Sequence, residues 1–351
     1  MERMKILKVG IIGANGYSGV ELIRILKQHP EVEISFLGSH STSGTLISEQ
    51  YPHLMGITDN RLEEVNIDDL MESADLFFFA TPSGVAKNMI HRFVEEGIPC
   101  IDLSGDHRLK DSNLYDKWYK YSPAPDNILQ KSTYGLPELF REEIKHASII
   151  ANPGCYPTAT LLGLAPLLKT NLIHLNSIII DGKSGVTGAG RKTSMSTHYC
   201  EVNENVKAYK IGTHQHIPEM EQVIQSFSGM DATITFTPHL IPMSRGILCT
   251  IYGDLRQTIT TKEAIGLYNE FYQKEYFVRV RQENHWPATK EVYSSNFCDL
   301  GITVDERTNR IMIVSVIDNV MKGASGQAVQ NMNIMNGWDE QTGLNITPVY
   351  P

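Results

Sequence analysis

Three glycines, at positions 13, 16 and 19, stand directly after an apolar run, Leu7–Ile12, and directly before a segment with helical periodicity. In such a turn the first glycine permits a tight bend and the second a close approach to a pyrophosphate. The third lets helix and sheet pack closely, while the helix N-terminus faces the phosphates. A glycine-rich turn of purely structural use is the alternative. The order strand, turn, helix favours a dinucleotide-binding βαβ unit.

Short apolar strands alternate with helical segments up to residue 154, and they are rich in Ile, Val and Phe on both faces, as in a parallel sheet covered by helices. Beyond it, longer alternating strands fit an antiparallel sheet better. We therefore expect an α/β Rossmann-type domain over 1–154, completed by a C-terminal helix over 326–351, and an α+β catalytic and dimerisation domain over 155–325. The predicted strands are Leu7–Ile12, Val32–Gly38, Asp75–Ala80, Ile98–Leu103, Ser148–Ala151, Ser177–Asp181, Ala232–Thr237, Ile247–Tyr252 and Ile311–Ile317.

The 351 residues are 41% hydrophobic and 20% charged, which is typical of a globular protein large enough for two domains. No apolar run approaches the roughly 18 residues of a membrane helix, and the start of the chain lacks a signal peptide's apolar stretch, so we expect a cytoplasmic protein. A net charge of −9 disfavours nucleic acid as a partner. Five irregularly spaced cysteines without a CxxC pair argue against a disulfide framework and a structural zinc site.

The end of the second predicted strand, Gly38–Thr42, carries hydroxyls and an imidazole but no acidic residue. NAD-preferring sites bind the ribose 2′-hydroxyl with an acid there, whereas these groups could accept a 2′-phosphate, so we predict NADP(H). Thr81–Gly84 follow the third strand at a carboxyl strand end, and an ordinary loop is the alternative. The cofactor-binding residues predicted here are Gly13, Asn15, Gly16, Tyr17, Ser18, Gly19, Ser39, His40, Ser41, Thr81, Pro82 and Ser83.

Cys155 lies between a predicted buried strand and an apolar helical run, Ala159–Leu168, and Pro157 suits the first turn of that helix. At a helix N-terminus, N–H groups and the helix dipole stabilise a thiolate and can lower its pKa from about 8.5 to roughly 3.5–7.5 when cations help. The same N–H groups could hold an oxyanion. We predict that Cys155 is a nucleophile; a small buried hydrophobic residue, which we expect of the other four cysteines, is the alternative.

His214 and His216 form an HxH pair that would point to one face of a strand. A metal pair is the disfavoured interpretation, since no further ligand set stands out and a cysteine nucleophile needs a base more than a metal. We predict no metal, His216 as general acid/base and His214 as its supporting partner in the substrate site. A hydrogen-bonded interior histidine is the alternative.

Eight motifs cover nearly all of the chain in order: GANGYSG (13–19), DLSGDHRL (102–109), YGLPEL (134–139), NPGCYPT (152–158), GKSGVTGAGR (182–191), HQHIPE (214–219), PHLIPMSRGI (238–247) and KGASGQAVQNMN (322–333). Through them the chain resembles the N-acetyl-gamma-glutamyl-phosphate reductases, the arginine-pathway branch of the aspartate-semialdehyde dehydrogenase superfamily. The resemblance implies NADPH-dependent reduction of N-acetyl-gamma-glutamyl phosphate to N-acetylglutamate 5-semialdehyde. It also implies that Cys155 carries the acyl group as a thioester and that His216 is the general acid/base.

The phosphate leaving group of an acyl phosphate is an anion that a guanidinium can neutralise. Arg108 follows a predicted strand end and is well placed for this, with a solubilising surface residue as the alternative. Arg191 and Arg245 are candidates for the phosphate or the substrate carboxylate, and the roles stay undivided. The predicted substrate-binding residues are Arg108, Arg191, His214 and Arg245.

The segment Ser184–Gly190 is predicted to bring backbone donors to the substrate or the nicotinamide, as its counterpart in the family suggests, or to form a plain turn. Asn319 and Asn331 could meet the nicotinamide carboxamide, although helix packing explains them nearly as well. The predicted cofactor-binding residues of this part are Ser184, Gly185, Asn319 and Asn331.

Gly105 and His107 stand where the family commonly has Ala and Phe, and Gln215 where it commonly has Arg. The differences at Gly105 and His107 are expected to affect how Arg108 is positioned. The difference at Gln215 is expected to affect which acyl group is preferred. An enzyme of the same mechanism acting on aspartyl phosphate or an aminoadipate analogue is the runner-up function. A dinucleotide-binding sensor without turnover is the third. We expect a homo-dimer or homo-tetramer paired through the antiparallel sheet, as in relatives, acting on a small molecule.

Overall fold

A computed structural model describes residues 6–350. Contacts within the chain divide them into two units: residues 6–153 with 324–345, and residues 154–323 with 346–350. Helix α12 (Gly326–Met335) belongs to the first unit but ends at Met335. The expected helix over 326–351 is therefore too long, because Gly337 takes a left-handed φ of 69° two residues after the last helical position.

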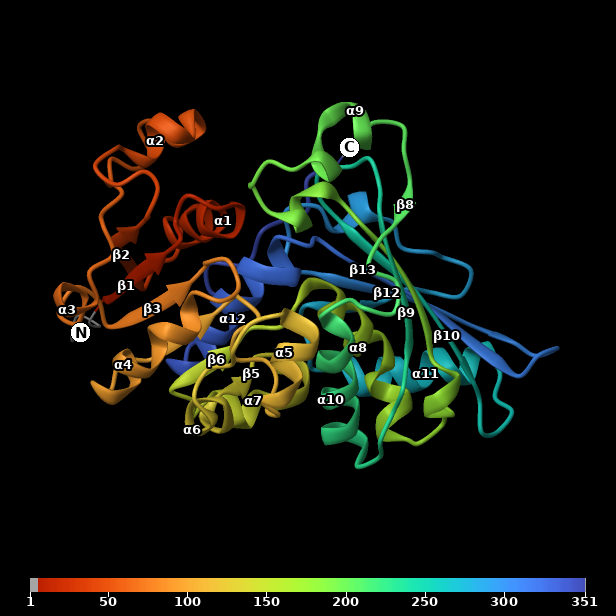
Figure 1. Ribbon diagram of the computed structural model, residues 1–351. Helices are drawn as coiled ribbons and strands as arrows, with labels where there is room; N and C mark the ends of the chain where they lie inside the picture. The colour runs from red at the N-terminus through yellow and green to blue at the C-terminus, as the bar shows by residue number, and fades with distance from the viewer. Residues whose placement is uncertain (1–5, 351) are drawn as a thin grey trace, which may run out of the picture. The chain divides into compact units, whose positions relative to one another are not determined.

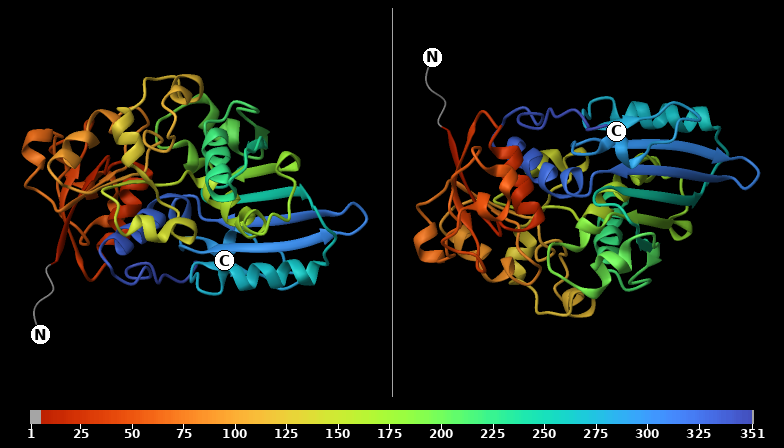
Figure 2. Two further views of the ribbon diagram at one scale, coloured as in Figure 1. Left: turned by 90° about the horizontal axis from the view of Figure 1, so that it is seen from below. Right: turned by 90° about the horizontal axis from the view of Figure 1, so that it is seen from above.

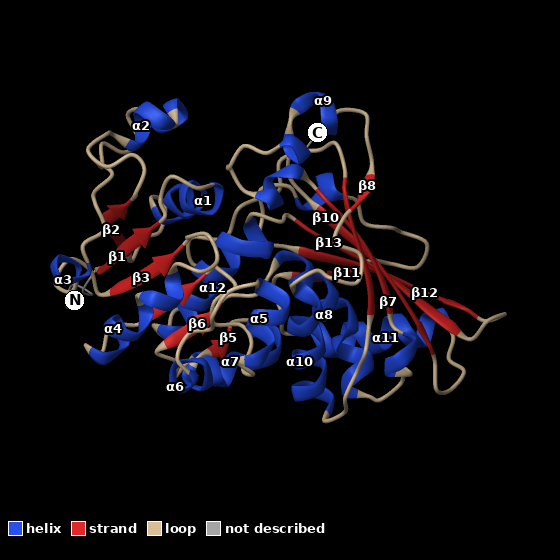
Figure 3. Cartoon of the chain, viewed as in Figure 1, coloured by secondary structure: helices blue, strands red, loops and turns tan. Residues whose placement is uncertain are grey.

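Within the described residues, a six-stranded parallel sheet in the order β2-β1-β3-β4-β6-β5 forms the core of the first unit (Figures 1 and 3). All four residues of β3, Leu-Phe-Phe-Phe, are buried, as expected of a strand covered on both faces. The strands are β1 (Leu7–Ile12), β2 (Val32–Gly38), β3 (Leu76–Phe79), β4 (Cys100–Asp102), β5 (Thr133–Tyr134) and β6 (Ile149–Ala151). The helices are α1 (Tyr17–Leu26), α2 (Ile47–Gln50), α3 (Ile67–Leu70), α4 (Ile90–Glu95), α5 (Asn113–Tyr119), α6 (Asp126–Lys131), α7 (Pro137–Ile144) and α12.

The turn between β1 and α1 depends on two of its glycines. Gly13 has a φ of 89°, and a Cβ there would lie 2.5 Å from the Ala80 carbonyl oxygen. A Cβ at Gly19, inside α1, would lie 2.4 Å from the Gly13 carbonyl oxygen and 2.7 Å from Ala14 backbone atoms. The first helix can therefore lie this close to the sheet only if position 19 has no side chain.

Gly19→Ala is expected to destabilise the protein by about 2 kcal/mol and to weaken nucleotide binding, because the added methyl group meets only backbone atoms that cannot rotate away. Urea-induced unfolding and a nucleotide titration measure both effects. Gly266→Ala in α11 (Thr261–Tyr272) is the matched control, since nothing lies within 4 Å of its new Cβ and helix propensity favours alanine. Equal stability of the two variants would contradict the prediction.

Helix α12 completes the first unit through buried polar contacts. It packs against α1 and α7. The Ser325 hydroxyl, at its N-cap, donates to the Ser18 carbonyl oxygen at 2.9 Å, and His29 Nε2 lies 2.9 Å from Asn333 Oδ1. Residues from opposite ends of the chain thus form one packed layer.

The second unit, in its described part, contains a seven-stranded mixed sheet in the order β11-β12-β13-β10-β7-β9-β8. Its centre is antiparallel, with parallel pairs only at β11–β12 and β7–β9. Helices α8 and α11 pack on it, and α10 packs on α8; the long strands run beside α11 in both views of Figure 2. The strands are β7 (Ile179–Ser184), β8 (Lys207–Ala208), β9 (Thr235–Leu240), β10 (Ile247–Asp254), β11 (Val278–Val280), β12 (Cys298–Asp305) and β13 (Arg310–Ile317), and the helices are α8 (Cys155–Lys169), α9 (Tyr199–Val202), α10 (His216–Ser228) and α11.

These two sheets confirm the predicted fold class, a Rossmann-type parallel sheet with an α+β part that is largely antiparallel. Among the described residues, every helix is too short or too polar to cross a lipid bilayer.

Candidate active site

Cys155 is the first residue of α8, four residues after Ala151, where β6 ends. Gly154 is the N-cap and has no side chain that could accept a hydrogen bond from the first helical N–H groups. Pro157 has no N–H, and the Thr158 N–H donates to the Gly154 carbonyl oxygen at 2.9 Å. The Cys155 side chain is partly exposed. The predicted position at a helix N-terminus, where the dipole favours a thiolate, is therefore present.

The other cysteines differ from Cys155 in burial. Cys100, Cys249 and Cys298 are buried, and burial raises the pKa of the Cys249 thiol to about 12 and that of Cys100 well above its usual value. Both thiols therefore stay protonated at neutral pH. The expectation that all four are core residues is wrong for Cys200, which is exposed in α9.

The backbone at Gly323 lies close to Cys155. A Cβ at Gly323 would lie 2.8 Å from the Cβ of Cys155, and the Gly323 N–H donates to the Asp318 carbonyl oxygen at 3.0 Å in a π-helical turn. The Asp318 side chain accepts from the N–H groups of Val320 and Met321 at 2.8 and 3.1 Å, which stiffens this turn. π-helical turns of this kind are often found at functional sites.

The HxH pair does not lie on a strand, contrary to the prediction, because Pro218 favours the first turn of a helix. His216 is the first residue of α10, and His214 lies in the turn before it. The His216 N–H donates to His214 Nδ1 at 3.1 Å, so the neutral His214 ring carries its proton on Nε2. Burial, and secondarily the charge of Lys210, lowers the pKa of His214 to about 3. His214 is thus a neutral orienting group at physiological pH.

Helices α8 and α10 pack against each other (Figure 1), and the contacts of Tyr156 with His214 and His216 bring their first turns together. The ring of Tyr156 has its centroid 5.8 Å from that of His214 and 6.1 Å from that of His216, and its hydroxyl donates to the His239 carbonyl oxygen at 3.1 Å. The fully buried carboxyl group of Glu219 accepts from the Gly154 N–H at 2.8 Å. These contacts hold the predicted nucleophile and the predicted base in one corner of the second unit.

Among the predicted cofactor residues of the first unit, Asn15, Ser41 and Thr81 lie at the turn from β1 to α1. Asn15 Nδ2 donates to the hydroxyls of Ser41 and Thr42 at 3.0 and 3.1 Å, which ties the glycine turn to the end of β2. The N-cap of α1, Gly16, has no side-chain hydrogen bond, so the first helical N–H groups, those of Tyr17, Ser18 and Gly19, are not satisfied by a cap. Such a helix start suits a pyrophosphate.

The other cofactor residues predicted in this unit differ in exposure. Ser39 is buried, its hydroxyl 2.8 Å from that of Thr42, whereas His40 is exposed. Thr81 Oγ1 is buried without a hydrogen-bond partner, and its backbone N would lie 3.1 Å from a Cβ at Gly13. An orphaned polar atom beside a turn that accepts no side chain fits a bound nucleotide. Pro82 and Ser83, next in the chain, are exposed.

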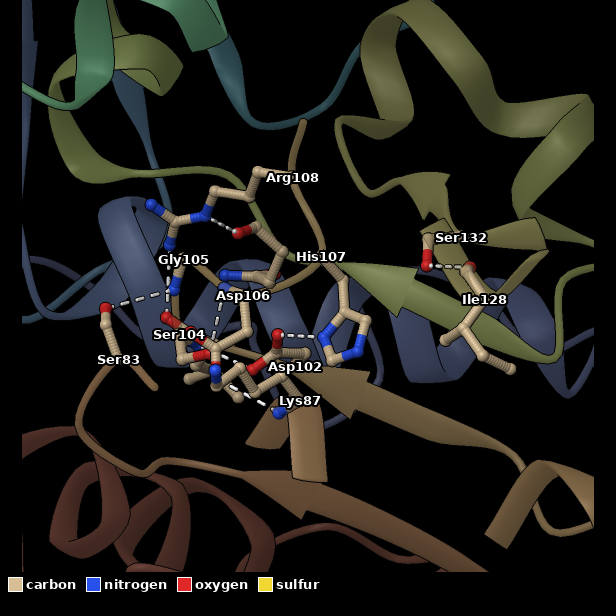
Figure 4. A network of polar contacts seen from close by, with 12 residues as sticks. Ser83, Lys87, Asp102, Ser104, Gly105, Asp106, His107, Arg108, Ile128 and Ser132 are labelled. Atoms are coloured by element: carbon tan, nitrogen blue, oxygen red, sulfur yellow. Dashed lines mark hydrogen bonds and ion pairs between the residues drawn. The ribbon is translucent and has the colours of Figure 1, made fainter. Parts of the chain in front are cut away.

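Arg108 is buried in the polar network of Figure 4, so the alternative of a solubilising surface residue is wrong. Its Nε donates to the Asn152 carbonyl oxygen at 2.8 Å and a terminal nitrogen donates to the Leu103 carbonyl oxygen at 3.0 Å. The guanidinium is therefore fixed against the segment that leads to Cys155 in the chain.

Two buried acids support the same loop. Asp102 and His107, both fully buried, pair at 2.6 Å, and Asp106 accepts from the N–H groups of Gly84 and Lys87 at 2.7 and 3.1 Å. Burial, and secondarily the charge of Asp102, raises the pKa of Asp106. His107, which departs from the family pattern, thus has a buried hydrogen-bond partner in Asp102. At the other departure, Gly105, an added Cβ would lie 2.3 Å from the Tyr119 ring, so a larger residue would require that ring to shift.

The remaining predicted residues of the second unit fall into two groups. Asn319 accepts from the Gly246 N–H at 2.7 Å and donates to the Thr187 hydroxyl at 3.0 Å, which joins the segment Ser184–Gly190 to the turn of Arg245. Arg245 lies 3.6 Å from Asp318, with its guanidinium 6.0 Å from the Tyr293 ring centroid. Arg191 stands apart from this group as an exposed residue.

Three further predicted residues, Ser184, Gly185 and Asn331, have hydrogen-bond partners. The buried Ser184 hydroxyl donates to the Gly185 carbonyl oxygen at 3.0 Å, and the Gly185 N–H donates to the Gly246 carbonyl oxygen at 2.9 Å. Asn331, fully buried in α12, donates to the Gly135 carbonyl oxygen at 2.8 Å and to Asn152 Oδ1 at 3.1 Å. The amide NH₂ group of Asn331 thus has hydrogen-bond partners within the first unit.

The chain is 52% identical to the N-acetyl-gamma-glutamyl-phosphate reductase of Bacillus subtilis (strain 168) over 345 residues, which cover 98% of this chain and all of that protein. It is also 52% identical, with the same coverage, to the enzyme of that name from Geobacillus kaustophilus (strain HTA426). The chain belongs to the N-acetyl-gamma-glutamyl-phosphate reductase family. Residues 8–147 match the family model "Semialdehyde dehydrogenase, NAD binding domain" and residues 155–319 match "Semialdehyde dehydrogenase, dimerisation domain". The first unit is therefore a nicotinamide-nucleotide-binding domain.

Solved structures show the same fold at low sequence identity. The aspartate semialdehyde dehydrogenase II of Vibrio cholerae, complexed with ASA, has a TM-score of 0.72 at 17% identity and covers 95% of this chain, with 99% of its own length matched. The aspartate semialdehyde dehydrogenase of Candida albicans with NADP has a TM-score of 0.72 at 15% identity and the same coverage. This chain thus has the same overall fold as these two aspartate semialdehyde dehydrogenases.

Sequence reasoning assigned no role to Glu219 or Tyr156, although both belong to quoted motifs. The signal for Glu219 was its spacing of three residues from His216, which places both on one face of a helix once α10 is known to begin at His216. Reading the HxH pair as part of a strand hid this relation.

Proposed function

We propose that this protein reduces N-acetyl-gamma-glutamyl phosphate to N-acetylglutamate 5-semialdehyde with NADPH, in arginine biosynthesis, through a thioester on Cys155. The observation that carries the mechanism is the placement of Cys155 at the start of α8, beside the start of the helix that carries His216. The reaction named by relatives of about half identity over the full chain supports the substrate.

Cys155 attacks the acyl carbon of the substrate. Its sulfur–carbon bond forms, the thiol proton passes to His216, and the bond from carbon to the phosphate oxygen breaks, releasing inorganic phosphate. The first-turn N–H groups of α8 stabilise the negative charge on the carbonyl oxygen during attack. The neutral His214, which accepts the His216 N–H, fixes the backbone from which the base acts.

A reduced nicotinamide, when bound, supplies the hydride that brings the thioester to the aldehyde level. The residues that we propose to hold the nucleotide are those of the glycine turn, with Asn15, Ser41 and Thr81, a proposal supported by the Asn15–Ser41 hydrogen bond and the orphaned Thr81 hydroxyl. On collapse of the thiohemiacetal, the carbon–sulfur bond breaks to the semialdehyde and the proton held by His216 returns to the sulfur. Arg108, Arg191 and Arg245 are the cations available for the phosphate and the substrate carboxylate.

Semialdehyde oxidation in the reverse direction tests the function. Formation of NADPH from NADP, phosphate and N-acetylglutamate 5-semialdehyde should exceed that with aspartate semialdehyde by at least about a hundredfold in kcat/KM, because the second substrate lacks the acetyl group and one methylene. A preference for aspartate semialdehyde would support the runner-up reaction. Nucleotide binding without turnover of either aldehyde would support the sensor.

The preference for NADP is expected to depend on the exposed end of β2. His40→Asp should raise the KM for NADPH at least about tenfold and leave the KM for NADH within about twofold, since a carboxylate there repels a 2′-phosphate. His53→Asp, also exposed in the first unit, makes the same charge change and should alter neither value. Equal effects on both cofactors would show that position 40 does not sense the 2′-phosphate.

We also propose a cytoplasmic homo-dimer or homo-tetramer paired through the mixed sheet. The match of residues 155–319 to a dimerisation-domain model and the partly exposed alternate residues of β10 support this assembly. Light scattering on a sizing column measures the oligomeric state.

A further inference from the structure

Glu219 is a fully buried acid that takes no part in the reaction steps described above. It lies in the first turn of α10, three residues after His216, and its Oε1 accepts from the Gly154 N–H at 2.8 Å. Burial of a carboxyl group is unfavourable unless hydrogen bonds or charges compensate it. The position of buried Glu219, beside the proposed nucleophile and the proposed base, therefore indicates a role in the reaction.

The hydrogen bond to Gly154 reaches the residue that caps α8 and directly precedes Cys155. A spacing of three residues places the Glu219 and His216 side chains on the same face of α10. One side chain thus connects the turn of the nucleophile with the helix of the base. The carboxyl group of Glu219 thus lies in the first turn of α10 and accepts from the Gly154 N–H.

We propose that Glu219 is a positioning residue that aligns Cys155 with His216 and supplies the negative charge that keeps the proton on His216 between the two proton transfers. This inference rests on the proposed function. Its carboxylate lies near both titrating groups, so its charge should favour the protonated form of each. Removal of that charge alone should therefore move both limbs of the pH profile in the same direction, toward lower pH.

Other charged or titratable groups around this corner cannot replace that charge. His214 is neutral at physiological pH, and burial raises the pKa of Tyr209 to about 12 and that of Tyr156 further, so both phenols keep their protons. Lys210 is exposed and donates to Gln215 at 2.9 Å. The groups on the neighbouring strands and on the turn beside Cys155 are Asp181, Lys183, His239, Cys249, Asp318 and the buried Lys322; Lys183 and His239 each pair with Asp181.

The test compares Glu219→Gln, which retains an oxygen acceptor without the charge, with Glu219→Ala, which has neither. The readouts are the pH dependence of kcat/KM and of Cys155 alkylation by iodoacetamide, measured without substrate in a Cys200→Ser background that removes the exposed second thiol. Because alkylation needs no turnover, it reports on Glu219 even if the proposed substrate is wrong. Glu221→Gln is the matched control: it lies in the same helix and its Oε1 accepts the Ile234 N–H at 3.1 Å.

We expect Glu219→Gln to shift both limbs of the activity profile and the alkylation midpoint down by roughly one pH unit and to lower kcat about tenfold, with KM within about twofold. Glu219→Ala should lower kcat about a hundredfold, since the Gly154 N–H also loses its acceptor. Glu221→Gln should match the wild type. Glu219→Gln profiles that superimpose on those of the wild type would overturn the inference, and the Gln variant decides the question even if the Ala variant does not fold.

Discussion

Cys155→Ser is expected to lower kcat/KM at least about 10³-fold, a loss of about 4 kcal/mol in transition-state stabilisation. A thiol at a helix N-terminus is ionised in part at neutral pH, whereas a serine hydroxyl at the same place is not. The swap is nearly isosteric and the site is partly exposed, so the fold should be unaffected. Steady-state kinetics in both directions measure the loss, and mass spectrometry of acid-quenched enzyme should detect an acyl adduct on residue 155 in the wild type alone.

Cys200→Ser is the matched control, because Cys200 is the exposed cysteine of α9 and has no role in the proposed reaction. Its kcat/KM should remain within about twofold of the wild type. If Cys155→Ser kept more than about a tenth of the activity, the thioester mechanism would be excluded even though the family assignment would stand.

His216→Asn is expected to lower kcat about 10²- to 10³-fold at neutral pH while KM changes little, because the amide can hold a hydrogen bond but cannot carry a proton. His214 cannot substitute for it: its pKa is about 3, and its Nδ1 already accepts the His216 N–H. The residual rate should also lose its dependence on pH over the range in which the imidazole titrates. Initial rates across a pH series give both results.

His174→Asn is a control for the loss of an imidazole from the second unit, since His174 is exposed before a 3-10 turn that carries none of the proposed machinery. Its profile should superimpose on that of the wild type. A His216→Asn variant with an unchanged pH profile would assign the proton transfers to another group.

Local signals made part of this architecture predictable. The glycine turn and the flanking apolar runs located β1 and β2 at their observed bounds, and Pro157 marked the start of α8. Strands of two residues, β5 and β8, carry too little periodicity to be recognised. β12 lacks strict alternation because its first five residues are all buried, which made it unlike the neighbouring strands.

Contacts between distant segments were beyond the reach of pattern reasoning. Gly154 and Glu219 are 65 positions apart, and Arg108 is 44 positions from the carbonyl group that it binds. The sequence shows that an arginine follows a strand, but only the fold decides whether its guanidinium faces solvent or a backbone carbonyl. The candidate site was therefore predicted as a set of residues, and its connections came from the structure.

The placement of α12 has a consequence for how the protein matures on the ribosome. The nucleotide-binding unit is encoded in two pieces, and its final helix is translated only after residues 154–323 of the second unit have been made. Until then α1 and α7 lack the partner that buries their facing surfaces, so the N-terminal piece should emerge as a chaperone client that becomes protease-resistant only once α12 has been made.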